Sequence, residues 1–171
     1  MNDALTQVRV RQLVDWKAVL MATLVAGTVA LLWNFFVVPA LLKTTPWVAV
    51  RLAGSILLGK GVLAPPATAH VGALIAAIAT HYVLALAMTA IIAYVVHRGG
   101  LVGGILIGGL LGLSFFCIDY YSLTYFMPQF FAIHHWSVVL GHILFGAVAG
   151  GTYELLEDQI FETDVTRVQG T

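Results

Sequence analysis

Four polar side chains stand inside stretches of sequence that are otherwise almost wholly apolar: Asn34, His81, His142 and Tyr153. Polar and ionisable groups are costly in hydrocarbon, so in membrane proteins they face the bundle interior and mark ion, proton or solute pathways. His142 and Tyr153 are eleven residues apart, about three helical turns, and therefore share a helix face. One hypothesis is a polar pathway for protons or a small solute. The alternative is that these groups form structural hydrogen bonds between helices.

Metal or haem ligation is a second hypothesis, because neutral imidazole suits zinc, copper and iron. If both chain ends lie on one side of a membrane, four potential ligands should gather near the opposite surface: His70, Asp119, His134 and His135. The deeper pair, His81 and His142, are candidates for the axial ligands of a haem. No tight ligand motif such as HExxH is present, so the absence of a resident cofactor is the simpler expectation.

Catalytic chemistry is not indicated. The sequence has no recognisable serine, histidine and acid constellation. The single cysteine, Cys117, lies beside Asp119, whose carboxylate disfavours the reactive thiolate. The acids at 154, 157 and 158 have the pattern of solvated charge at a helix end. We therefore expect a protein that is not an enzyme.

Long apolar runs carry these residues. A bilayer core about 30 Å thick needs about 20 apolar residues of helix, and every backbone polar group in lipid must be paired internally. Membrane-spanning helices are therefore predicted at about residues 18–42, 68–97, 99–119 and 136–157. The first run is too long for the core of a cleavable signal peptide and should remain as an anchor. The expected fold is an all-α four-helix membrane bundle in a single domain, residues 1–171.

Residues 44–66 separate the first two runs and differ from them. Apolar residues recur there at helical spacing, but Arg51 and Lys60 interrupt the pattern. We predict an amphipathic helix over about 46–59 that lies in the membrane interface or dips into the membrane.

Two later segments lack the character of a span. Residues 120–135 are rich in tyrosine and phenylalanine, which suits either the headgroup level or an ordinary loop with packed aromatic rings. The polar tail at 158–171 is expected to fray.

Glycines recur every four residues in the third run, and a shorter version occurs in the fourth: Gly100, Gly104, Gly108 and Gly112, then Gly146 and Gly150. Residues four apart share a helix face, and glycines there let a second backbone approach closely. This glycine zipper predicts tight packing between the third and fourth helices or between two copies of the chain.

Composition and charge agree with a membrane protein. Sixty per cent of residues are hydrophobic and only 9% are charged, against about 25% charged in soluble domains. Net charge is zero and no basic patch is present, so nucleic acid is not an expected partner. With four spans, five basic residues fall on the side of the termini and three on the other, which predicts cytoplasmic termini.

The stretches SILLGKGVLAPPAT (55–68) and GHILFGAVAG (141–150), together with His81, resemble a family of uncharacterised small bacterial inner-membrane proteins, some of them labelled sodium:proline symporter. The resemblance covers most of residues 16–157. It implies four helices with an interfacial or re-entrant segment before Pro65-Pro66, and a bacterial inner membrane location. It singles out six positions, Lys60, Pro65, Pro66, Thr68, His81 and His142, and implies no activity.

Three functions follow as hypotheses. The leading one is a non-enzymatic accessory or packing subunit, or a homo-oligomer, whose partners are the lipid bilayer and other membrane subunits. The second is a small channel or transporter with a histidine-lined polar pathway. The third is a haem- or metal-binding membrane redox subunit.

Overall fold

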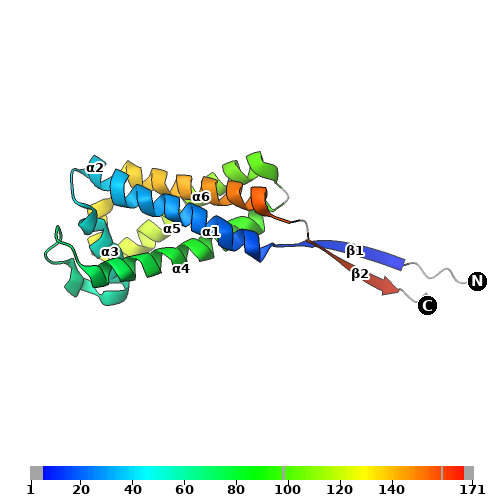
Figure 1. Cartoon of the computed structure of the whole chain (residues 1–171), viewed down its shortest axis with the longest axis horizontal. Helices are drawn as coiled ribbons and strands as arrows, with labels where there is room; N and C mark the ends of the chain where they lie inside the picture. The colour runs from blue at the N-terminus through cyan, green and yellow to red at the C-terminus, as the bar shows by residue number, and fades with distance from the viewer. Residues whose placement is uncertain (1–5, 98, 159, 168–171) are drawn as a thin grey trace, which may run out of the picture.

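In the computed structural model, which describes residues 6–97, 99–158 and 160–167, four helical segments have the length and apolarity to cross a bilayer (Figure 1). They are Trp16–Leu42, α4 (Val71–Val96), α5 (Gly100–Phe126) and α6 (Trp136–Leu156). The shortest contains 21 residues and is therefore about 30 Å long. The predicted all-α membrane bundle is confirmed.

The first spanning segment is not a uniform α-helix. It consists of α1 (Trp16–Leu32), a π-helical turn η1 (Trp33–Val37) and the short α2 (Val38–Leu42). Proline has no N–H, so Pro39 cannot make the usual α-helical bond to the residue four positions earlier. Just before it, the amide of Val38 donates to the carbonyl of Trp33, five residues back. The wider turn keeps the helix continuous and changes the direction of the side chains that it carries.

The third spanning helix is longer than predicted. We expected it to end near Asp119, but α5 continues to Phe126, and the 3-10 turn η3 (Pro128–Ile133) follows. Part of the segment expected at the interface is therefore helical, because no helix-breaking residue occurs until Pro128. As a consequence, Asp119 lies about two turns inside the helix rather than at its end.

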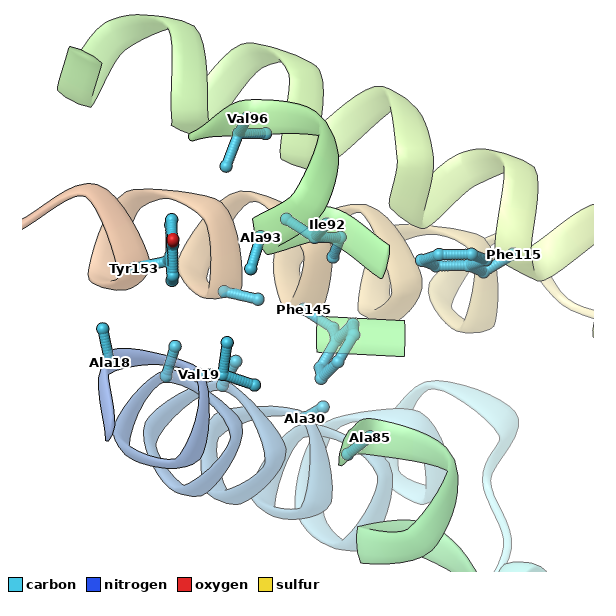
Figure 2. Packing of buried hydrophobic residues seen from close by; sticks show 13 residues of the cluster. Ala18, Val19, Ala30, Ala85, Ile92, Ala93, Val96, Phe115, Phe145 and Tyr153 are labelled. Carbon is cyan, nitrogen blue, oxygen red and sulfur yellow. The ribbon is translucent and has the colours of Figure 1, made fainter. Parts of the chain in front are cut away.

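The bundle is organised around α6. This helix contacts α1, α4 and α5, whereas α4 packs mainly on α1 and on the short α3 (Pro46–Leu58). Figure 2 shows the main core between these helices, where Val19, Ile92 and Tyr153 are fully buried. Large apolar side chains such as Val83 and Leu106 point outward from the spans, as expected where lipid replaces water.

Glycines allow α5 and α6 to approach most closely. Gly104, Gly108 and Gly112 of α5 face Gly146 and Gly150 of α6. A Cβ on Gly104 would lie 2.7 Å from the carbonyl oxygen of Gly150, and one on Gly108 would lie against the carbonyl oxygen of Gly146. The expected helix contact is thus present within a single chain.

Gly100 does not take part in this contact, although the four-residue spacing assigned it to the same ridge. Its φ is +67°, and a Cβ there would meet nothing within 4 Å. Gly100 is the first residue of α5, where a left-handed backbone lets the chain turn out of α4.

The segment between the first two spans is helical over α3, one residue shorter than predicted, and continues into the 3-10 turn η2 (Lys60–Leu63). Arg51 of α3 is buried, and its guanidinium holds the following loop. Its Nε donates to Thr68 O at 2.8 Å, and its Nη1 to Val62 O at 2.6 Å and Ala64 O at 3.4 Å. Its Nη2 donates to the Thr68 hydroxyl at 2.7 Å. A residue that looked like an interruption of the apolar pattern is therefore the clamp of this segment.

A two-stranded antiparallel ribbon, not expected from the sequence, extends from the bundle (Figure 1). It pairs β1 (Thr6–Leu13) with β2 (Ile160–Arg167). The register places Arg9 opposite Asp164 and Arg11 opposite Glu162. The expectation of a frayed polar tail is therefore wrong for β2. The pairing also shows that both chain ends leave the bundle at the same end.

Asp15 links the start of α1 to the chain just after α6, next to the ribbon. As the N-cap of α1, its Oδ1 accepts from the amides of Lys17 at 2.8 Å and Ala18 at 3.3 Å, and its Oδ2 accepts from the amide of Asp158 at 3.1 Å. Burial of the Asp15 carboxyl would raise its pKa, but these hydrogen bonds to the charged form and the nearby Lys17 outweigh burial and lower it. The amide of Asp15 donates in turn to the Tyr153 hydroxyl at 3.3 Å.

Candidate functional site

A cavity of ≈ 120 Å³ inside the bundle collects four polar side chains, each from a different element: Asn34 of η1, His81 of α4, Asp119 of α5 and His142 of α6. The rest of its wall is apolar and includes Ala30, Ala85 and Phe145, which Figure 2 labels. At about 30 Å³ per water molecule, the volume suits a few waters or one small solute; a dry cavity of about 150 Å³ can hold benzene.

His81 is oriented by a hydrogen bond to a neighbouring helix. Its Nε2 lies 2.8 Å from the carbonyl oxygen of Gly27 in α1. A carbonyl can only accept, so Nε2 carries the proton and Nδ1 of the neutral ring is left as an acceptor. Gly27 also makes room for the adjacent Tyr82, because a Cβ on Gly27 would lie 2.9 Å from the Tyr82 ring.

His142 has the opposite tautomer for the same reason. Its Nδ1 lies 2.9 Å from the carbonyl oxygen of Val138, one turn earlier in α6, so Nδ1 is the donor and Nε2 the acceptor. The ring also packs edge-on against Phe116 with centroids 5.5 Å apart. Contacts on two sides therefore restrict the direction of this imidazole.

The π-helical turn η1 positions Asn34. The Nδ2 of Asn34 donates to Ala30 O at 2.9 Å, so its Oδ1 stays available as an acceptor. The adjacent Trp33 ties the turn to α6, because its Nε1 donates to Ser137 O at 2.9 Å. An irregular turn at this position agrees with the frequent occurrence of π-bulges at functional sites.

Asp119 is the fourth polar residue of the cavity. It is partly buried, and none of the residues that the structure describes donates a hydrogen bond to its carboxyl group. The prediction that Asp119 lies with histidines near the membrane surface assumed that its helix ends at this residue, whereas α5 continues to Phe126. The continued run of aromatic and apolar residues to Phe126 was the available signal that Asp119 lies deeper.

Tyr153, a fourth candidate for the polar pathway, is not part of the cavity. It is fully buried in the core close to the termini, where its hydroxyl meets the amide of Asp15 and the side chain of Glu157. Sharing a helix face with His142 does not place it at the same depth, since eleven residues of helix separate the two by about 16 Å.

The expected outer metal site is not assembled among the residues that the structure describes, which contain no group of three or more His, Cys, Asp and Glu side chains able to hold a metal. Two of the histidines have other roles. The Nδ1 of His70 accepts from the amide of Ala73 at 2.9 Å and that of His135 from the amide of Ser137 at 3.3 Å, so each caps its own helix. His134 instead packs against the ring of Tyr120, with centroids 5.0 Å apart.

Haem ligation by His81 and His142 finds no support in the geometry. Both side chains line the cavity, but its ≈ 120 Å³ is less than the space that holds a single benzene ring. A porphyrin would require the helices to separate.

A second, mostly apolar cavity of ≈ 180 Å³ adjoins the first, and Asn34 and His81 line both. Its other walls come from α1, η1, α3, α4 and η3 and include Phe35 and Phe130. Asn34 and His81 border both spaces, which together are called the composite site. The first space also carries Asp119 and His142, and the second is otherwise lined by apolar side chains.

Comparisons with protein-family models, with curated proteins and with solved structures found no match for this chain. The resemblance to a family of small inner-membrane proteins thus stays a prediction. Two of its positions, His81 and His142, lie in the polar cavity, while Thr68 binds Arg51.

Proposed function

We propose that the protein is a small membrane transporter that binds a polar solute in the cavity between Asn34, His81, Asp119 and His142. The observation that carries the proposal is the convergence of these four side chains, from four elements, on one space within an apolar bundle. Intramembrane polar groups are expensive and are retained where they serve a pathway.

A transporter fits the packing better than an open pore does. Between the cavity and the end of the bundle that bears the termini lies tightly packed core, including Val19, Ile92 and Tyr153, each fully buried. A solute can leave the site in that direction only if these helices move. We place the protein in a bacterial inner membrane with both termini on the cytoplasmic side, because basic residues are more numerous on the side of the termini.

A role as a packing subunit or homo-oligomer is less well supported. That expectation rested on the glycines at four-residue spacing, and α6 occupies the glycine face of α5 within the same chain. The contact therefore occupies Gly104, Gly108 and Gly112, the α5 glycines that a second copy would otherwise use.

Proteoliposomes containing the purified chain test the proposal. Proton entry is followed with trapped pyranine after a pH jump, and entry of glycerol and urea by light scattering after an osmotic jump. Flux of at least one of these should exceed that of empty liposomes and should fall at least tenfold in His81→Ala and in His142→Ala.

His97→Ala is the matched control. Its Nδ1 also bonds a backbone carbonyl, that of Tyr94 at 2.9 Å, but it lies at the end of α4 and outside the cavity. Flux equal in wild type and both cavity variants, or absent altogether for all three probes, would refute transport.

A further inference from the structure

We propose that the composite site selects a small organic cation, an ammonium group that carries one apolar substituent. The inference rests on the proposed function, because the same cavity holds the solute. It adds the chemical class of that solute. The ammonium belongs in the polar cavity, beside Asp119, and the substituent in the apolar cavity beyond His81.

Apart from the second N–H of Asn34, the unpaired hydrogen-bonding atoms of the polar cavity are acceptors. Backbone carbonyls take the donor nitrogen of each histidine, which leaves Nδ1 of His81 and Nε2 of His142 with lone pairs. Asn34 uses one N–H on Ala30 O and keeps its Oδ1. A ligand that suits these atoms must bring donors, and an ammonium group brings up to three N–H donors and no acceptor.

The charge of the site points to the same ligand class. Asp119 is a carboxylic acid in a membrane-spanning helix, and none of the described residues donates to it or pairs with it. An isolated carboxylate in an apolar environment is strongly disfavoured unless a cation accompanies it. A bound ammonium would supply that cation, whereas an anionic ligand would add a second negative charge.

The size of the adjoining cavity limits the substituent. Its ≈ 180 Å³ slightly exceeds the space of about 150 Å³ that holds benzene, and Phe35, Phe130 and several aliphatic side chains line it. Since His81 and Asn34 border both cavities, the proposal places a ring on the apolar side, one carbon away from the ammonium. Benzylammonium is therefore a suitable probe.

Binding is measured on the purified protein in non-ionic detergent with fluorine NMR of 4-fluorobenzylammonium, and with the neutral 4-fluorobenzyl alcohol and the anion 4-fluorobenzoate for comparison. We expect the cation to bind at least tenfold more tightly than the alcohol, and the benzoate not to bind. Asp119→Asn should weaken the binding of the cation at least tenfold and leave the affinity for the alcohol unchanged. Unchanged alcohol binding also shows that the variant is folded.

Two further variants separate the parts of the site. Ala53→Leu fills the apolar cavity and should weaken the binding of 4-fluorobenzylammonium. Methylammonium has no ring, so its affinity, measured by competition, should not change. Asp158 is an exposed acid just after α6, so Asp158→Asn should leave the affinity for all of these ligands unchanged. Equal affinity for cation and alcohol, or cation binding that survives Asp119→Asn, overturns the inference.

The binding and flux experiments fail independently. Histidine-dependent flux of glycerol, urea or protons without cation binding refutes the ammonium ligand and supports transport. Asp119-dependent binding without flux of these probes or of 4-fluorobenzylammonium itself supports the ligand and refutes transport.

Discussion

Replacing Gly108 by alanine tests whether glycine contact holds α5 and α6 together. The added Cβ would lie against the carbonyl oxygen of Gly146 and 3.0 Å from its carbonyl carbon. Carbon atoms in ordinary contact are about 3.5–4.0 Å apart, so the backbones of α5 and α6 must move apart by about 0.5–1 Å. Backbone atoms cannot rotate away as a flexible side chain can.

Gly103→Ala is the matched control, since this position lies in the same helix and a Cβ there meets nothing within 4 Å. Both substitutions remove the same backbone freedom and gain about 0.5–1 kcal/mol of helix propensity. The difference between the two variants therefore isolates the packing term, which for overpacked interiors is about 1–3 kcal/mol.

The assay is reversible unfolding in mixed micelles with increasing SDS, followed by circular dichroism. Gly103→Ala should be as stable as wild type or more stable, and Gly108→Ala should be less stable than Gly103→Ala by about 1–3 kcal/mol. Equal stability of the two alanine variants would contradict the packing of α5 on α6 within one chain.

Two other perturbations probe contacts outside the cavity. Asp15→Asn should reduce the free energy of unfolding by about 1 kcal/mol at neutral pH, because the variant keeps Oδ1 but has no second oxygen to accept from the amide of Asp158, and it removes the charge. The folded-state pKa of Asp15 is lowered, so its contribution is complete above the unfolded value near 3.8 and is lost as pH falls through the folded value. Unfolding curves at several pH values should then converge for wild type and variant in acid; a constant gap would contradict this. Arg51→Met leaves the carbonyls of the η2 loop without donors and should cost about 2–4 kcal/mol, whereas the exposed Lys60→Met should stay within about 0.5 kcal/mol. Limited proteolysis should cut the Arg51→Met loop faster, and equal rates in both variants would refute the clamp.

Much of the architecture could be predicted from residue chemistry. Long runs with so few charges have no stable place in water, and lipid requires the backbone to satisfy its own hydrogen bonds, so four spanning helices followed directly. The short helix with Arg51 was also predictable from its spacing, although the role of Arg51 was not. The paired strands were missed because their pairing joins the two ends of the chain, which no local pattern reveals.

The site was only partly predictable. His81, His142 and Asn34 stood out because polar groups in apolar runs are few. Asp119 was assigned to the wrong neighbours, because its depth depends on where α5 ends.

Composition and residue spacing are enough to show that lipid surrounds the helices and to identify their rare polar groups. Which of those groups meet depends on the packing of the helices. The spanning helices are apolar on every side, so no hydrophobic face indicates which residues point inward. The rotation of each helix is set instead by close contacts, such as the glycines between α5 and α6 and the π-helical turn before Pro39, and these contacts bring Asn34, His81, Asp119 and His142 to one cavity.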